Sequence, residues 1–173
     1  MSGGMTGNRW VWLALGVAIG LAVAYTWPYE RAYANTCDRD AQFSMLTVPV
    51  SGLIGVSDPL DGVFTLDFLT GDVRGGVLNK QMGKFTGFYY RNVAADFSVD
   101  PNKEARYAFA SGYAQLAGAG GATFAAGTLY IAELTSGKVI CYAFPWRESV
   151  AKMAPTPLIP MDGFLFRPPA AKE

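Results

Sequence analysis

Residues 129–146, LYIAELTSGKVICYAFPW, contain two short apolar runs that are separated by the turn signal Thr-Ser-Gly-Lys. Residues 63–78, VFTLDFLTGDVRGGVL, have the same layout around Thr-Gly-Asp. Runs of β-branched and aromatic residues on both sides of such a turn predict a β-hairpin in each place. The two stretches align without gaps at an offset of 66 residues, so this small chain carries the same unit twice.

The aligned positions predict how the two turns are built. Gly71 aligns with Gly137, and a glycine is needed where a tight turn requires a positive φ. Asp67 aligns with Glu133, and we expect both carboxylates to accept backbone N–H groups of their turns. Because one hairpin cannot bury its apolar face alone, the second copy is expected to supply the partner surface.

Further candidate strands flank the two hairpins, at 43–50, 85–91, 106–116 and 163–167. Residues 93–97 predict a short helical turn that Asn92 could cap. The fold class that follows is mainly β: a small antiparallel β domain, either a sandwich or a partly open barrel, built from two hairpin-containing repeats over residues 35–146. Residues 147–173 contain five prolines and are interpreted as a Pro-rich C-terminal tail.

The N-terminal segment, residues 1–34, contains an uncharged stretch from Trp10 to Trp27 with aromatic residues at both ends. This pattern predicts a transmembrane helix over residues 10–27. An uncleaved signal anchor is the favoured interpretation, and a signal peptide cleaved after Ala34 is the alternative. The layout predicts a single-pass membrane protein with a cytoplasmic N-terminus and its C-terminal domain on the extracytoplasmic side.

Within this stretch, Gly16 and Gly20 form a small-residue ridge. Such a ridge lets two helices approach closely, so a homo-oligomer through this helix is one expectation. The alternative is that small residues are simply abundant in a signal segment.

Composition excludes several classes of function. The chain has 14 basic and 14 acidic residues and no histidine. The zero net charge argues against a nucleic-acid partner, and the missing histidine excludes Ser-His-Asp and Cys-His catalysis within the chain. No metal or cofactor motif is present, so neither is expected.

The two cysteines, Cys37 and Cys141, could form a disulfide if the domain lies outside the cytoplasm. The alternative is two separate thiols. Four residues are candidates for binding: Tyr89, Tyr90, Arg91 and Trp146. Since side chains alternate in a strand, at least one aromatic of the Phe88-Tyr89-Tyr90 run should point away from the core. With Trp146 it could form a stacking surface for a glycan or a protein partner, unless a second sheet covers it.

Four segments of the sequence together resemble the pattern of a known group of proteins: Phe64 to Asp72, Gly83 to Phe85, Asn92 to Asp96, and Tyr130 to Trp146. Together with the apolar N-terminus, they resemble a group of short membrane-anchored proteins of planctomycete bacteria. The resemblance implies an envelope protein and carries no catalytic residues.

These observations lead to two hypotheses of function. The first is a membrane-tethered, non-enzymatic binding or assembly module of the bacterial cell envelope. The alternative is a hydrolase that acts on envelope polysaccharide through two carboxylates, for which Asp67 and Glu133 are the candidate pair. A structural role of both residues in their turns is the favoured interpretation.

Overall fold

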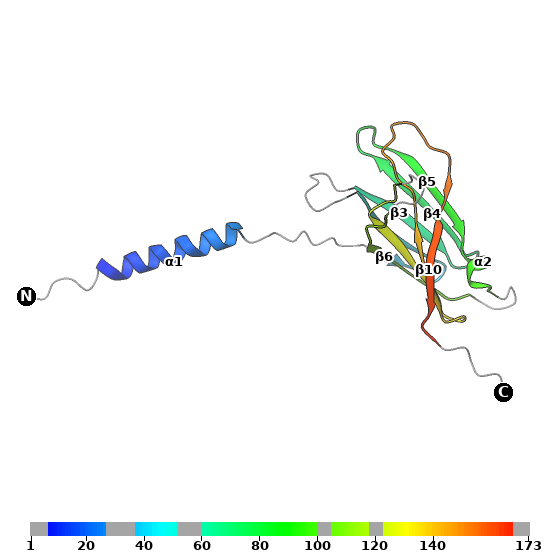
Figure 1. The fold of residues 1–173 in the computed structure, drawn as a ribbon, viewed down its shortest axis with the longest axis horizontal. Coiled ribbons are helices and arrows are strands. Elements are labelled where there is room, and N and C mark those ends of the chain that lie inside the picture. Colours follow the sequence, from blue (N-terminus) through cyan, green and yellow to red (C-terminus); the bar gives the residue numbers. More distant parts are fainter. Residues whose placement is uncertain (1–6, 27–36, 52–59, 100–104, 118–122, 168–173) are drawn as a thin grey trace, which may run out of the picture. The chain divides into compact units, whose positions relative to one another are not determined.

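A computed structural model describes residues 7–26, 37–51, 60–99, 105–117 and 123–167. The chain divides into two compact units, Met1–Ala34 and Asn35–Glu173. The first unit contains one helix, α1 (Gly7–Thr26), drawn in blue in Figure 1. Its apolar side chains between Trp10 and Val23 are exposed, and a Cβ added to Gly16 or Gly20 would point into open space.

Among the described residues, no helix is long and apolar enough to cross a membrane. The expected transmembrane helix over residues 10–27 is therefore not supported. Trp27 and the cleavage site after Ala34 lie outside the described residues.

The second unit consists of two β-sheets packed face to face (Figure 1). Sheet A has the strand order β1-β2-β3-β4-β5-β9, with the bounds β1 (Cys37–Arg39), β2 (Phe43–Ser51), β3 (Leu60–Asp67), β4 (Asp72–Asn79), β5 (Lys84–Asn92) and β9 (Thr156–Pro157). Sheet B has the order β10-β8-β7-β6, with the bounds β10 (Ile159–Leu165), β8 (Lys138–Ala143), β7 (Gly127–Glu133) and β6 (Tyr107–Tyr113). All neighbouring strands are antiparallel except the short parallel pair β5 and β9.

The mainly β, antiparallel prediction is therefore confirmed, and of the two expected architectures the domain adopts the sandwich. The hairpin β3–β4 lies in the middle of sheet A, and the hairpin β7–β8 lies in the middle of sheet B. Each hairpin is preceded by a neighbouring strand, β2 in one sheet and β6 in the other. The two copies of the repeat thus supply the central strands of the two layers.

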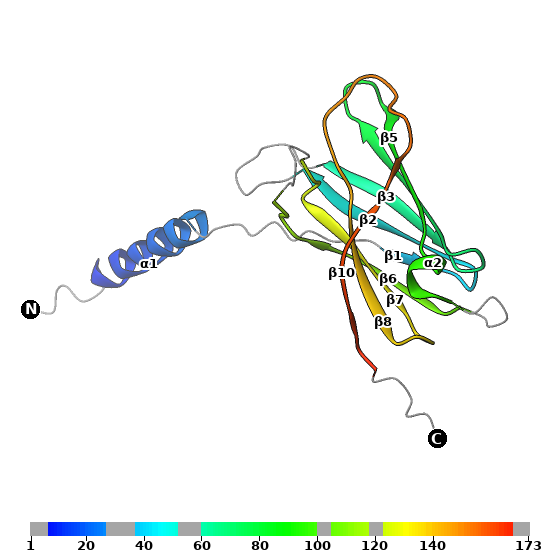
Figure 2. The same cartoon turned by 45° about the vertical axis from the view of Figure 1, so that its right-hand side comes forward.

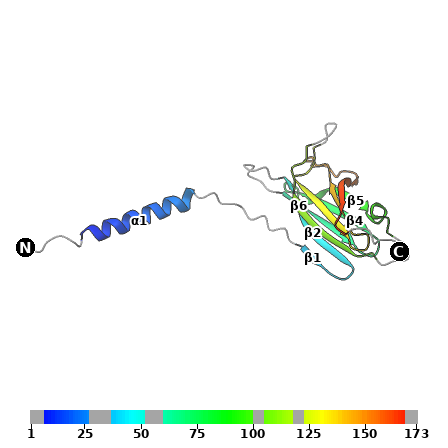
Figure 3. The ribbon, with the colours of Figure 1, turned by 60° about the horizontal axis from the view of Figure 1, so that its bottom comes forward.

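The core lies between the sheets and is rich in aromatic side chains. Phe64 from sheet A packs against Phe144 with ring centroids 4.9 Å apart, and Tyr89 meets the same ring edge-on at 4.9 Å. Along one side of the sandwich, β2 and β6 lie next to each other (Figure 3). There the Ser111 hydroxyl donates a hydrogen bond of 2.7 Å to the carbonyl of Thr47.

On the other side, a long segment crosses from one sheet to the other. This crossing segment, residues 144–158, leaves β8 in sheet B and runs beside β5 of sheet A (brown to orange in Figure 2). It forms β9 there and returns to sheet B as β10. Its last residue, Leu158, is only 1% exposed and belongs to the core.

The expected boundary between a domain at 35–146 and a Pro-rich tail at 147–173 is therefore wrong. Residues 147–167 form part of the sandwich, because the apolar side chain of Leu158 fills the core and β10 pairs with β8 along its length. Of the expected edge strand at 163–167, residues 163–165 are present as the C-terminal part of the longer strand β10.

The helical turn expected over 93–97 is α2 (Ala94–Phe97). Asn92 accepts a hydrogen bond of 3.1 Å from the Ala94 amide, two residues ahead. The residue at the N-cap itself is Val93, which has no side-chain capping bond. Asn92 therefore stabilises the first turn of α2 from the residue before the N-cap.

Candidate ligand-binding site

A cavity of about 670 Å³ lies between β5 and the crossing segment. Its volume falls within the range of small-molecule sites, which is roughly 300–1,000 Å³. The side chains of Trp146 and Met153 each lie 3.4 Å from the position that a Cβ on Gly87 would occupy. The residues that line the cavity are Tyr89, Thr123, Pro145, Trp146, Arg147, Ser149, Ala151, Lys152, Met153, Ala154 and Thr156.

Gly87 of β5 lies next to two of the residues that line this cavity, Trp146 and Met153. It follows the irregularity in register between β4 and β5, where Val77 pairs with Gly87 and Leu78 pairs with Phe85. Such a bulge re-aims the side chains of a strand. A Cβ at position 87 would lie in van der Waals contact with Trp146 and Met153, so this position packs directly against both side chains.

Hydrogen bonds from sheet A hold the crossing segment in place. The Tyr89 hydroxyl donates to the Pro145 carbonyl at 2.8 Å, and the amide of Met153 donates to the Thr86 carbonyl at 2.8 Å. The Asn79 side-chain amide donates to the Ser149 carbonyl at 3.1 Å. These three bonds fix the crossing segment to sheet A and so hold the two walls of the cavity together.

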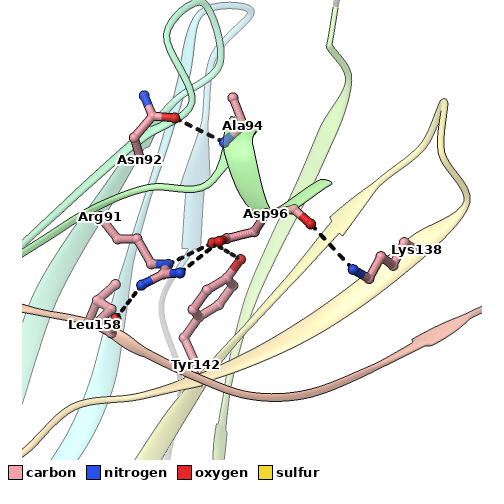
Figure 4. Close-up of polar contacts among 7 residues, drawn as sticks. All are labelled: Arg91, Asn92, Ala94, Asp96, Lys138, Tyr142 and Leu158. Atoms are coloured by element: carbon pink, nitrogen blue, oxygen red, sulfur yellow. Dashed lines mark hydrogen bonds and ion pairs between the residues drawn. The ribbon is translucent and has the colours of Figure 1, made fainter. Parts of the chain in front are cut away.

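A charged network holds the far end of the crossing segment (Figure 4). The Arg91 guanidinium donates to both carboxylate oxygens of Asp96, at 2.6 and 2.7 Å, and to the Leu158 carbonyl at 2.9 Å. The Tyr142 hydroxyl donates to the same carboxylate at 2.9 Å, and the Lys138 ammonium donates to the Asp96 carbonyl at 3.3 Å. This network joins β5, α2, β8 and the crossing segment.

The protonation states of the network follow from its contacts. Burial alone would raise the pKa of Asp96, but the hydrogen bonds from Arg91 and Tyr142 outweigh it, and the pKa lies below its ordinary value. Burial, followed by the hydrogen bond to Asp96, raises the pKa of Tyr142 well above that of a free tyrosine. Asp96 is therefore ionised and Tyr142 is neutral near pH 7, which is the arrangement that keeps the network bonded.

The structure divides the four predicted binding residues among three places. Tyr89 and Trp146 line the cavity. Tyr90 is 45% exposed and points to the outer face of sheet A, as the alternation along β5 requires. Arg91 takes part in the charged network with Asp96. A single surface made by all four residues is therefore not present, because neighbouring residues of one strand face opposite sides of the sheet.

Sequence reasoning missed Arg147, Lys152 and Met153, which complete the cavity. They belong to the segment whose prolines predict a tail. The local signal was weak: both cations follow Trp146 in a segment without a strand pattern, and cations are common in loops. Only the return of Leu158 to the core shows that this segment folds back over β5.

A second hollow of about 430 Å³ lies on the outer face of sheet A. It is lined by Gln42, Phe43, Thr65, Asp67, Leu69, Asp72 and Arg74. Asp67 accepts hydrogen bonds from the turn amides of Leu69 and Thr70, at 2.8 and 3.1 Å. Asp72 accepts one of 2.9 Å from the Asn92 side chain.

Glu133 cannot form the alternative catalytic pair with Asp67 on a surface that a substrate reaches, because Glu133 is only 1% exposed. Its carboxylate accepts hydrogen bonds from the amides of Thr135, Ser136 and Arg106. Gly71 and Gly137 have φ values of 72° and 67°, so both turns contain the positive-φ glycine that their sequences require.

The two cysteines are not bonded to each other. Cys37 lies in β1 at the edge of sheet A, and Cys141 lies in β8 within sheet B. Because the core separates the two sheets, a disulfide between these residues does not form. Burial raises the pKa of the Cys141 thiol above its ordinary value, which makes it a poor nucleophile.

No protein-family model matches this sequence, and comparisons with curated proteins and with solved structures also found no match.

Proposed function

We propose that this protein is a membrane-associated, non-enzymatic binding module of the bacterial cell envelope, with the cavity beside the crossing segment as its binding site. The observation that carries the proposal is this cavity itself, which contains Trp146 and opens to solvent without any carboxylate among its lining residues. Convergent polar groups around a partly apolar hollow are the usual features of a ligand site.

The acidic residues support binding over catalysis. The Glu133 carboxylate accepts a hydrogen bond from its own turn, and the Asp96 carboxylate is paired with Arg91. The hydroxyls of Ser149 and Thr156, which line the cavity, each donate to a carbonyl within the crossing segment. With no histidine in the chain, these hydroxyls lack the commonest general base.

Binding is tested with the full-length chain in a mild detergent and fragments of envelope glycans, including peptidoglycan. Trp146→Ala should lose at least tenfold in affinity. Tyr90→Ala is the matched control, because it removes an exposed aromatic from the opposite face of β5. The far-UV circular dichroism spectrum of Trp146→Ala, recorded below its unfolding midpoint, checks that its fold is retained. Equal affinities of the two variants would contradict the proposed site.

The membrane association rests on α1. A helix with exposed apolar side chains around Leu13, Val17 and Leu21 needs an apolar environment, and a lipid bilayer supplies one. In fractionated cells the unchanged chain should sediment with membranes, whereas the double variant Leu13→Asp and Val17→Asp should move to the soluble fraction. Met45→Asp, which changes an exposed apolar residue of the sandwich, should leave the distribution unchanged.

The alternative function, hydrolysis of envelope polysaccharide, is favoured by one observation: Asp67 and Asp72 line the same hollow on sheet A. If this hollow is catalytic, the chain releases soluble sugars from envelope glycans, and Asp67→Asn abolishes the release. Under the binding proposal no such turnover occurs, and Asp67→Asn leaves glycan affinity unchanged.

A further inference from the structure

The cavity beside the crossing segment has an uneven charge. Among the residues that line it, Arg147 and Lys152 are charged, and both are positive. Both side chains are exposed, and within the described part of the chain neither makes an ion pair with an acidic residue. The Lys152 ammonium also lies 5.1 Å from the centre of the Phe88 ring, a cation–π contact with β5.

The second hollow, on the outer face of sheet A, has the opposite character. Asp67 and Asp72 line it together with the single cation Arg74. An anion that approaches the domain would be repelled by two carboxylates there, whereas it would meet two unpaired cations at the cavity. The two hollows of one sandwich therefore differ in the charge of the ligand that they can accept.

The interior of the cavity also restricts the shape of the ligand. Trp146 is partly exposed and packs against the core, and together with Met153 it provides apolar surface beside Gly87. A ligand that suits both parts has a compact ring with an apolar face and an anionic substituent that reaches the rim. A sugar ring with a carboxylate or a sulfate has these properties.

We infer that the cavity binds an acidic sugar unit of a glycan, with the ring against Trp146 and the anionic group between Arg147 and Lys152. This inference deepens the proposed function and rests on it. A carboxylate and a sulfate share the chemistry that the two cations recognise, and an exposed guanidinium can hold either with paired N–H donors.

The test measures binding by calorimetry with the full-length chain in a mild detergent. The probes are a tetramer of galacturonic acid, the same tetramer as its neutral methyl ester, and a sulfated dextran oligomer. The acidic tetramer should bind at least tenfold more tightly than the ester, and affinity should fall as salt is raised. The relative affinities of the acidic tetramer and the sulfated oligomer tell which anionic group the site prefers.

The double variant Arg147→Gln and Lys152→Gln should lose at least tenfold in affinity for the acidic tetramer and nothing for the ester. Arg74→Gln is the matched control, because it removes an exposed cation from the other hollow. Since Arg147 and Lys152 are exposed, the unfolding midpoint of the double variant should equal that of the unchanged chain.

The outcomes separate this inference from the proposed function. Equal binding of the ester and the acid, lost in Trp146→Ala, would overturn the acidic-sugar inference and leave the binding function in place. Binding of the acid that the double variant retains would also overturn the inference, because it would place the anion elsewhere. Failure of every glycan probe and of envelope fragments to bind would overturn both.

Discussion

The hairpins β3–β4 and β7–β8 have the same turn, yet they present opposite faces to the core. Val73 and Val139 occupy aligned positions, but Val73 is fully buried while Val139 is partly exposed. Phe64 is fully buried, while the aligned Tyr130 is 37% exposed. The alternation of buried side chains is thus shifted by one residue between the copies.

This difference shows that two separate properties of the sequence decide the strand register of a hairpin and the face that it buries. The turn residues set the pairing, which is why Leu66 faces Val73 and the aligned Ala132 faces Val139. The positions of the large apolar residues decide which face meets the other sheet. In the second copy Leu129 and Ile131 are the buried residues, so the face with Tyr130 points outward.

The same shift explains the different environments of the two turn acids. Glu133 lies on the inward face and is only 1% exposed, while Asp67 lies on the outward face and lines a hollow. Glu133 also reaches a third donor, the amide of Arg106, which comes from the chain that leads into β6. The two residues align in the sequence, but only Glu133 joins its turn to a neighbouring strand.

The largest expected effect is the difference in stability lost when each of these two acids is replaced by alanine. Glu133→Ala leaves three backbone N–H groups without their acceptor, so the free energy of unfolding should fall by about 3 kcal/mol, at about 1 kcal/mol for each bond. Asp67→Ala exposes its two turn amides to water and should cost about 1 kcal/mol. Urea unfolding of the full-length chain measures both, and equal losses would show that burial does not distinguish the turns.

The next comparison uses two residues of the same type at aligned positions. Val73→Ala removes buried methyl groups and leaves a small cavity, so it should lower the free energy of unfolding by about 2 kcal/mol. Val139→Ala should cost less than about 1 kcal/mol, because this side chain keeps contact with solvent. Similar losses in the two variants would mean that the two copies bury the same face.

A smaller difference is expected between the turn glycines. Alanine at either position takes up a positive φ, which costs about 1 kcal/mol. At Gly71 the new Cβ would also lie 3.0 Å from the Ala94 Cβ and 3.1 Å from the buried Tyr107 hydroxyl. At Gly137 it would lie 2.8 Å from the Arg167 Cβ, and this exposed residue at the surface shifts more easily than the buried Tyr107. Thermal unfolding should therefore show a larger loss for Gly71→Ala, and the reverse order would contradict this packing.

The smallest effect is a dependence on pH. Burial would raise the pKa of Glu133, but the hydrogen bonds from Ser136, Thr135 and Arg106 lower it below its ordinary value. The stability that this carboxylate contributes is therefore present above the unfolded pKa, near 4.5, and is lost as the pH falls through the folded pKa. Asp96, whose pKa is also lowered, adds to the same loss.

Glu133→Gln should flatten this acid dependence in part, since a neutral amide does not titrate. The control is Val139→Ala, which removes no titratable group and should leave the slope in place. Urea unfolding at a series of pH values between about 3 and 6 measures the difference. An identical slope in Glu133→Gln and in the unchanged chain would show that Glu133 does not contribute.

The sequence by itself determined the local elements of this protein. Positive-φ glycines, turn acids and runs of β-branched residues act within a few residues of chain, so both hairpins and the strands β2, β5 and β6 could be read directly. The same local pattern showed that Tyr89 and Tyr90 face opposite sides of a strand. The short strand β1 was not predicted, because three residues carry too little pattern.

Only the tertiary structure decided how these elements meet. It placed the two copies in different sheets with opposite faces buried, and it brought residues 144–158 back over β5 to form the cavity. These arrangements depend on contacts between distant residues, such as Tyr89 with Pro145 and Arg91 with Leu158, which are 56 and 67 positions apart. A local pattern does not encode such pairs, since their stability comes from core packing and from hydrogen bonds that exist only after the chain has folded.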